Sequence, residues 1–340
     1  MKQRKIYIDM LNIVACFCVI CMHCNGIVHN YTDSIEWKQS MVVETIAYWA
    51  VPVFFMISGA TLMNYDERYD TKTYLKKRFS RVGIPFFIWS IINLIWKCYV
   101  GRIEFKWSIS YLCSLILNNK IENVYWFFMP LFSVYLCIPV LAYLKKNRNL
   151  LKYMLLCGIL TYSILPTVGI LIQIPFNSSL AFPIAGGYVL YVILGYMIST
   201  DDLSKKQRYL IYISAILCAC LRYFSTLIGS YNAGALYKVF WGYYNFPAMA
   251  LSVGVFVLFK SFKYDWFLRN QRRIKVLSGI SSASFGIYLM HMIVNNFFYF
   301  CGVNASGWKW RMLGPILVYC ISLICVKCMQ RIPIIKKIVP

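Results

Sequence analysis

The sequence predicts an all-α fold: a polytopic membrane helix bundle of about ten transmembrane helices. Of the 340 residues, 60% are hydrophobic and only 14% are charged. Apolar runs of about 20 residues, the length that a helix needs to cross a bilayer, recur along the whole chain. No stretch between these runs has the size of a separate soluble domain, so residues 1–340 are expected to form a single membrane-embedded domain.

A window of about twenty residues gives each expected span in order. The spans run Tyr7 to Val28, Met41 to Met63, Val82 to Val100, Val124 to Leu144, Leu151 to Val168, Phe182 to Ser199, Tyr209 to Ile228, Val239 to Lys260, Gly279 to Phe300 and Met312 to Met329. The first is too long, with the wrong flanks, for a removed signal peptide, so it is interpreted as an uncleaved span. A further apolar stretch, Trp107 to Leu117, is too short to cross and is expected at the interface or as a re-entrant piece.

The positive charge, a net +23 over the chain, is spread unevenly over the loops between the expected spans. The loops expected on one side hold most of the bases: Lys2, Arg4, Lys5, Arg68, Lys72, Lys76, Lys77, Arg78, Arg81, Lys145, Lys146, Arg148, Lys152, Lys205, Lys206, Arg208, Lys260, Lys263, Arg269, Arg272, Arg273, Lys275, Lys327, Arg331, Lys336 and Lys337. The positive-inside rule therefore predicts that both termini are cytoplasmic. The same charge favours contact with anionic membrane lipids, and nucleic acid is not an expected partner because no folded basic domain presents a reading element.

Most of the fourteen cysteines fall within apolar runs and are interpreted as small packing residues. Cys16, Cys18, Cys21 and Cys24 surround His23 in the first span. Helical spacing points these side chains in several directions, whereas a closed zinc site needs ligands that converge on one point. No metal is therefore expected.

Two of the three histidines, His23 and His291, lie inside apolar segments. An ionisable group at membrane depth is costly, so each either takes part in proton chemistry or hydrogen-bonds a neighbouring helix. At about 100° per residue, two helix faces carry polar stripes. The first consists of Asp9, Asn12, Cys16, Val19 and His23, and the second of Ser281, Ser284, Tyr288 and His291. If the stripes face each other, they line a pathway.

An arginine and two tryptophans in the expected spans each allow two interpretations. Arg222 is either an interior anion ligand or an interfacial anchor. Trp49 and Trp126 are interpreted as packing or interfacial residues rather than substrate platforms.

Four segments, taken together and in order, resemble the acyltransferase family 3 membrane proteins. YIDMLNIVACFCVICMH resembles the opening span of that family, VPVFFMISG its second-span signature, KKRFSRVGIPFFIWS its basic RxxR loop, and SSASFGIYLMH its late histidine-containing span. Many members have arginine where this chain has Asn12, so the part of that position in donor handling is in doubt. The chain resembles the short, stand-alone glycan acyltransferases of the family.

The resemblance implies a ten-span enzyme of the bacterial cell membrane. Such an enzyme takes an acyl group, usually acetyl, from cytoplasmic acyl-CoA, here expected to be acetyl-CoA. It places this group on a hydroxyl of an exopolysaccharide, a lipid-linked glycan or another cell-envelope acceptor. No metal cofactor is implied.

The chemistry of acyl transfer assigns expected roles to these residues. His23, near the outer face, is the expected general base, because transfer to an alcohol needs a group that takes the hydroxyl proton. His291, expected to lie deeper by one or two helical turns, polarises the thioester carbonyl or relays the proton. Asp9 either orients the first stripe or favours the positive end of its helix.

The expected binding residues fall into two groups. Arg78 and Arg81, with Lys76 and Lys77, form a phosphate clamp for the donor or serve only topology. Asn12 is expected to bind the donor together with these bases. The residues expected to bind the acceptor are Tyr288, Ser284 and Arg222.

Two other classes of protein are considered. A proton-coupled transporter or flippase of an envelope precursor also carries buried histidines, but paired halves with interrupted helices are not visible in the sequence. A glycan polymerase or ligase needs a sizeable outer loop, and the longest here, about Gly101 to Asn123, is modest.

Overall fold

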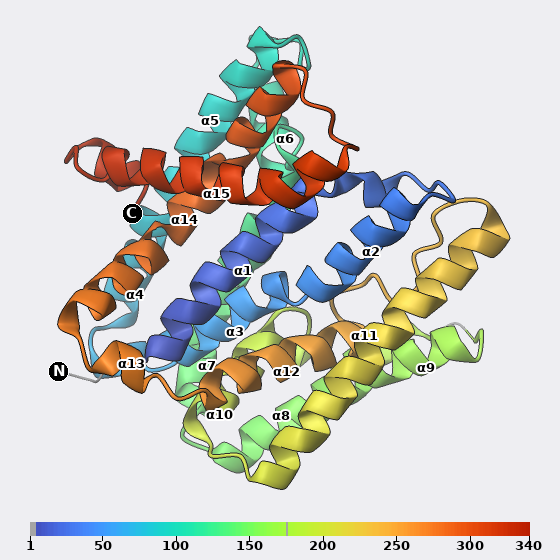
Figure 1. Cartoon of the computed structure of the whole chain (residues 1–340). Coiled ribbons are helices and arrows are strands. Elements are labelled where there is room, and N and C mark those ends of the chain that lie inside the picture. Colours follow the sequence, from blue (N-terminus) through green and yellow to red (C-terminus); the bar gives the residue numbers. More distant parts are fainter. Residues whose placement is uncertain (1–4, 175) are drawn as a thin grey trace.

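The computed structural model describes residues 5–174 and 176–340 as a bundle of helices (Figure 1). The helices are α1 (Ile6–Cys24), α2 (Ile35–Ala47), α3 (Ala50–Leu62), α4 (Thr71–Arg78), α5 (Ile84–Tyr99), α6 (Ile109–Leu117), α7 (Phe128–Leu144), α8 (Arg148–Ile159), α9 (Leu165–Leu171), α10 (Val189–Thr200), α11 (Lys205–Ala233), α12 (Phe246–Ser261), α13 (Asp265–Leu268), α14 (Gln271–Phe300) and α15 (Trp308–Met329). The predicted all-α fold is confirmed.

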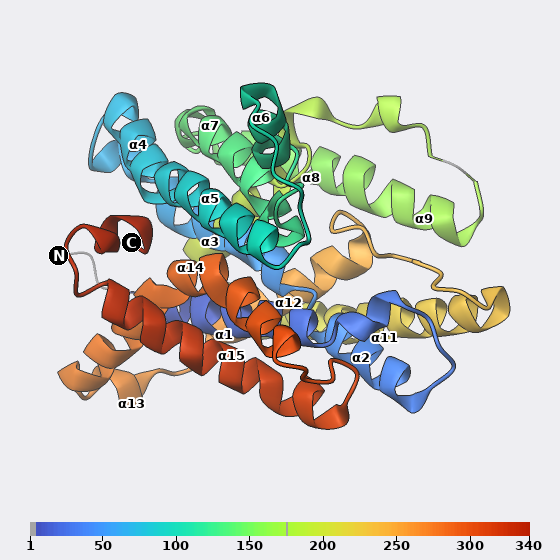
Figure 2. The same ribbon diagram turned by 90° about the horizontal axis from the view of Figure 1, so that it is seen from above.

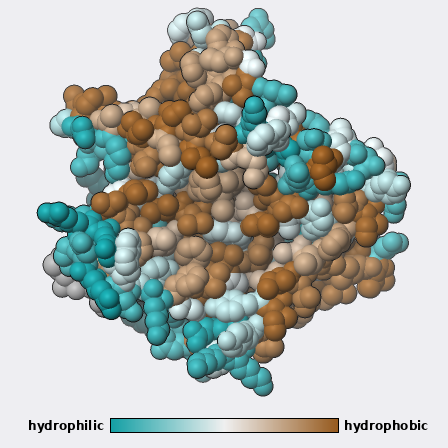
Figure 3. All heavy atoms as spheres, viewed as in Figure 1, coloured by the Kyte–Doolittle hydropathy of each residue, from teal (hydrophilic) through white to brown (hydrophobic). Residues whose placement is uncertain are grey.

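Among the described residues, 8 helical segments are long and apolar enough to cross a membrane. Two shorter apolar helices, α10 and α12, lie where the sixth and eighth spans are expected. Hydrophobic side chains gather over the middle of the face seen in Figure 3, with hydrophilic residues toward opposite edges. The chain is therefore a multi-pass helical membrane protein.

The basic loops meet at one end of the bundle, which we call the basic end. Lys145 pairs with Asp66, and Arg148 pairs with Asp201. Lys260 Nζ donates to Ile198 O at 2.8 Å, and Lys5 at the start of α1 donates to Ser199 O at 3.4 Å. These contacts join loops that the charge pattern assigns to one side of the membrane.

Several spans are interrupted, which the sequence did not reveal. The second span breaks between α2 and α3 at Tyr48 and Trp49, and the third and fifth contain π-helical turns at Phe79–Gly83 and Leu160–Ile164. At the end opposite the basic one, irregular chain, which includes the 3-10 turn Pro183–Ala185, replaces the first α-helical turns expected for two spans. Helix therefore begins at Val189 rather than Phe182, and at Phe246 rather than Val239. Non-helical backbone at membrane depth is tolerated where it lines a cavity.

Close helix packing fixes the middle of the bundle. A Cβ on Gly59 of α3 would lie 1.9 Å from Val192 O, and one on Gly195 of α10 would lie 2.0 Å from Met56 O. Only glycine permits these two helices to approach so closely. α1 lies in the interior beside α3, α14 and α15, as the two ribbon views together show (Figure 1, Figure 2).

Candidate active site

The two predicted polar stripes lie against each other, on α1 and α14. Asn12 Nδ2 donates to Ser281 O at 2.8 Å and to Ser281 Oγ at 3.2 Å. Cys16 Sγ contacts Ser284 O at 3.5 Å, and farther along both helices Cys24 Sγ contacts Asn295 Oδ1 at 3.5 Å. Residue numbers rise together along the contact, so the two helices run parallel. The stripes therefore line a common path through the bundle.

His23 and His291 meet on this path. Their ring centroids are 5.3 Å apart, at an interplanar angle of 34°. One helical turn rises 5.4 Å, so a ring separation of 5.3 Å allows an offset of about one turn in depth between the two histidines and excludes an offset of two turns. The register of α1 on α14, which the sequence does not show, sets this separation.

The tautomer of neutral His291 follows from its backbone contact. Its side chain is 0% exposed, and Nδ1 lies 2.7 Å from Tyr288 O. Because a carbonyl oxygen only accepts, Nδ1 carries the proton and Nε2 holds the lone pair. No described protein group hydrogen-bonds Nε2. His291 therefore offers a proton acceptor inside the bundle, beside His23.

A cavity of about 170 Å³ lies on the basic side of the histidines. We call it the inner cavity, and its lining residues are Asn12, Phe54, Ile57, Ser58, Phe127, Leu131, Tyr135, Ser281, Ser284, Phe285 and Tyr288. Asn12, Ser284 and Tyr288, all selected from the sequence, are thus brought together.

A second cavity, of about 230 Å³, contains the His23 side chain. We call it the aromatic cavity, and its lining residues are Val19, Met22, His23, His29, Glu44, Tyr48, Val51, Val124, Trp126, Phe127, Trp241, Tyr243 and Tyr288. Phe127 and Tyr288 line both cavities. The two cavities are therefore separated by a wall of these two side chains, next to the histidine pair.

Tyrosine hydroxyls hold the walls of the aromatic cavity in place. Tyr288 donates to Val124 O, and Tyr125 donates to Leu289 O at 2.6 Å, which fixes the 3-10 turn Asn123–Phe127 on α14. Tyr48 donates to Trp241 O and Tyr191 donates to Tyr243 O. The chain between α11 and α12 is thereby anchored, and two of its backbone carbonyls, those of Trp241 and Tyr243, receive hydrogen bonds.

Arg222 of α11 is buried, with 2% of its surface exposed, so the interfacial-anchor reading is wrong. Its Nη1 donates to Glu44 O at 3.2 Å, and its Nη2 lies 3.7 Å from Glu44 Oε1. Its Cζ lies 3.5 Å from the centroid of the Tyr48 ring. Arg222 lies behind the aromatic cavity, whereas Glu44 lines it.

The donor-side cations are only partly brought together. Arg78 is half-buried, with its Cζ 5.9 Å from the Tyr74 ring centroid and 5.8 Å from that of Tyr135. Arg81 is exposed, and the exposed Lys77 has its Nζ 3.9 Å from the Tyr69 ring centroid. Of the predicted clamp, Arg78 is the member that reaches the interior, since Tyr135 lines the inner cavity.

An apolar cavity of about 400 Å³ continues from Arg78 between α5, α6 and α7, and it also includes Tyr135. Tyr135 thus joins this cavity to the inner cavity, and Phe127 and Tyr288 join the inner cavity to the aromatic cavity, so that the three adjoin one another between Arg78 and His23. Asp9, in the first turn of α1, is buried, but it is not among the described residues that line these three cavities.

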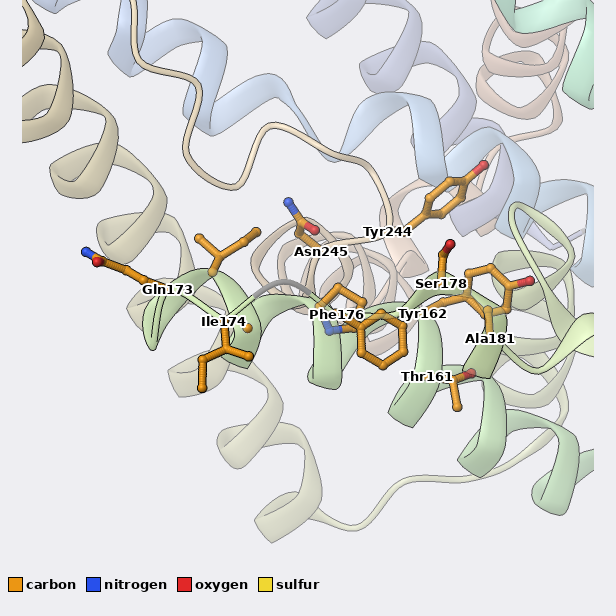
Figure 4. A pocket seen from close by; sticks show the side chains of 12 residues that line it. Thr161, Tyr162, Gln173, Ile174, Phe176, Ser178, Ala181, Tyr244 and Asn245 are labelled. Atoms are coloured by element: carbon orange, nitrogen blue, oxygen red, sulfur yellow. The ribbon is translucent and has the colours of Figure 1, made fainter.

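A larger cavity, of about 610 Å³, lies elsewhere (Figure 4). α9 and the chain after it form most of its wall, and Tyr162 and Tyr244 are also among its lining residues. None of the described residues that line it is a histidine, a carboxylate or a basic residue. The volume of a cavity by itself therefore does not identify the candidate active site.

The sequence interpretation missed several lining residues, namely Glu44, Tyr48, Trp241 and Tyr243. It also read Trp126 as a packing residue, although this side chain lines the aromatic cavity. Glu44 carried a usable signal, because it is a carboxylate within the expected span Met41 to Met63. The aromatic residues carried none, because tyrosine and tryptophan are common in membrane spans and at their ends.

The structure is thus a helical multi-pass bundle with a histidine pair beside two adjoining cavities. Comparison with protein families identifies it more closely: the acyltransferase domain family matches residues 5–328. The chain therefore belongs to this family and is a membrane acyltransferase. None of the curated proteins and none of the solved structures compared with the chain matches it.

Proposed function

We propose that this protein transfers an acetyl group from cytoplasmic acetyl-CoA to a hydroxyl of a cell-envelope glycan, either an exopolysaccharide or a lipid-linked precursor. The observation that carries the proposal is the His23–His291 pair, 5.3 Å apart, at the wall between the inner and aromatic cavities. Donor and acceptor approach this pair from opposite ends of the bundle. The protein lies in the bacterial cell membrane with its basic end cytoplasmic.

The donor enters at the basic end. Arg78 binds a phosphate of the coenzyme, because a guanidinium forms strong charge-assisted hydrogen bonds with phosphate oxygens. Arg81 and Lys77 add positive charge near the entrance. The pantetheine arm extends past Tyr135 into the inner cavity, where Asn12 and Ser284 offer polar groups, and brings the thioester toward the histidines.

The transfer step is a direct displacement at the thioester. The acceptor oxygen attacks the carbonyl carbon, a C–O bond forms, and the C–S bond breaks to release coenzyme A. His23 takes the hydroxyl proton and returns it to the departing thiolate. In the reacting complex, His291 Nε2, which has no hydrogen-bond partner among the described residues, accepts a hydrogen bond from His23 and orients it, while the His291 Nδ1–H continues to donate to Tyr288 O.

Purified protein with acetyl-CoA labelled in the acetyl group tests the proposal. Transfer of label to a glycan extract, with release of one thiol per acetyl group, is the expected result. Failure of every envelope extract to accept label, with no thiol released, would contradict it. A proton-coupled flippase, which the interrupted spans also suit, would give that negative result.

A further inference from the structure

One wall of the aromatic cavity is a column of stacked planar groups. The Trp126 and Tyr243 ring centroids are 5.5 Å apart at 20°, and those of Tyr243 and Tyr48 are 4.4 Å apart at 11°. The Arg222 guanidinium closes the column against Tyr48. Stacking of this kind fixes the rings and gives the cavity a rigid wall.

Among the described residues that line this cavity, Glu44 is the only carboxylate. It belongs to α2 and is 7% exposed. A buried charge is costly unless it is compensated, and Arg222 provides the opposite charge from behind. The Nη2–Oε1 distance of 3.7 Å is longer than a good hydrogen bond, so the carboxylate keeps acceptor capacity toward the cavity.

A rigid aromatic wall beside one fixed carboxylate suits a particular chemistry. The C–H groups of a sugar ring are apolar and pack against aromatic side chains, whereas its hydroxyls donate to a carboxylate. His23 lines the same cavity, so a ring bound to Glu44 presents its remaining hydroxyls to the base.

We propose that Glu44 binds hydroxyls of a pyranose ring that rests on the aromatic wall, and that Arg222 is a positioning residue that holds Glu44 and Tyr48 in place. This inference rests on the proposed function, because the pyranose is the terminal unit of the glycan acceptor. It changes the expected role of Arg222, which acts through Glu44 rather than by touching the substrate.

A purely structural role is the competing explanation, in which Glu44 only neutralises Arg222. A variant that lacks both charges distinguishes the structural role of Glu44 from a role in sugar binding. Glu44→Leu/Arg222→Leu removes both charges and restores electrostatic balance, since replacing a buried ion pair by apolar residues is often neutral for stability. If Glu44 binds the acceptor, this variant stays folded but still binds the sugar poorly.

The chain offers a matched control in a second buried ion pair. Glu122 is 4% exposed, and its Oε2 lies 3.0 Å from Lys97 Nζ, but neither residue lines the aromatic cavity. Glu122→Gln therefore removes a buried carboxylate charge without touching the proposed sugar site.

The experiment has two readouts. Saturation-transfer NMR with methyl glycosides of glucose, galactose and N-acetylglucosamine measures ring binding without any acyl transfer, and labelled acetyl-CoA measures transfer. We expect wild-type protein and Glu122→Gln to bind at least one glycoside. Glu44→Gln and the double leucine variant should raise the acceptor KM or Kd by about 10- to 100-fold, with donor affinity unchanged.

Wild-type glycoside affinity in the double leucine variant, or a wild-type protein that binds none of the three glycosides, would overturn the inference. Absence of transfer alongside Glu44-dependent glycoside binding would instead contradict the proposed acyl transfer and leave the sugar site supported. The two failures are thus distinguishable.

Discussion

His23 of α1 and His291 of α14 face each other with their ring centroids 5.3 Å apart. The parallel register of the two helices, seen in the Asn12–Ser281 and Cys24–Asn295 contacts, sets this distance. Because His291 donates through Nδ1 to Tyr288 O, its basic nitrogen remains available to the partner histidine. In the proposed mechanism, this pair, contributed by the first and the ninth spans, handles the proton of the acceptor hydroxyl.

The first prediction concerns His23. His23→Ala should lower acyl transfer by about two to four orders of magnitude, the usual effect of losing a general base. Acyl-CoA affinity should change little, because the side chain lines the aromatic cavity and not the inner one. Transfer rate and donor Kd are measured on the same purified protein. Near-wild-type transfer would reduce His23 to a packed membrane histidine.

The second prediction concerns the pair as a unit. His291→Ala should also reduce transfer, because His23 loses the group that orients it. Residues that act together are strongly non-additive, so His23→Ala/His291→Ala should transfer about as slowly as His23→Ala alone. Rates of the two single variants and the double variant give the coupling. Losses that multiply would mean that the two histidines act independently.

The third prediction separates the two arginines of the RFSR segment. Arg78→Gln should weaken acyl-CoA binding by about 10- to 100-fold, the effect of losing hydrogen bonds to a charged group. Arg81→Gln should have a smaller effect, because Arg81 is exposed and screened by solvent. Lys77→Gln serves as the exposed control. Equal donor affinity in Arg78→Gln and Lys77→Gln would indicate that these bases only set the membrane topology.

The fourth prediction concerns orientation. In a background without the native cysteines, a cysteine in place of Ser34 should react with an impermeant reagent added outside the cell. A cysteine in place of Asp70, in the basic loop before α4, should react only after the membrane is opened. The basic-end contacts Lys145–Asp66 and Arg148–Asp201 place this loop with the other basic loops. Outside labelling at position 70 would reverse the topology.

The fifth prediction concerns packing. Gly195→Ala should destabilise the protein by about 1–3 kcal/mol, the usual cost of overpacking, because its Cβ would meet Met56 O of the neighbouring helix backbone. Gly26→Ala is the matched control, since nothing lies within 4 Å of a Cβ there. Thermal unfolding in detergent compares the two. Equal thermal unfolding midpoints for the two variants would show that α3 and α10 move apart at little cost to accommodate the added methyl group.

The sequence by itself determined the fold class and most of the span order, because apolar length and loop charge are local properties that a single chain displays directly. It also selected the two stripes, since helical periodicity fixes which residues share a face. Asn12, Ser284, Tyr288 and both histidines were therefore found before any packing was known.

Only the tertiary structure decided how these faces meet. The depth of His291 relative to His23 depends on helix register, and the Glu44–Arg222 pair joins residues 178 positions apart. Likewise, no local pattern predicts that the second span breaks at Tyr48, or that chain before α12 folds in to line a cavity. Such features depend on contacts between segments that are distant in sequence. These contacts provide hydrogen-bond partners for backbone N–H and C=O groups that would have none in lipid.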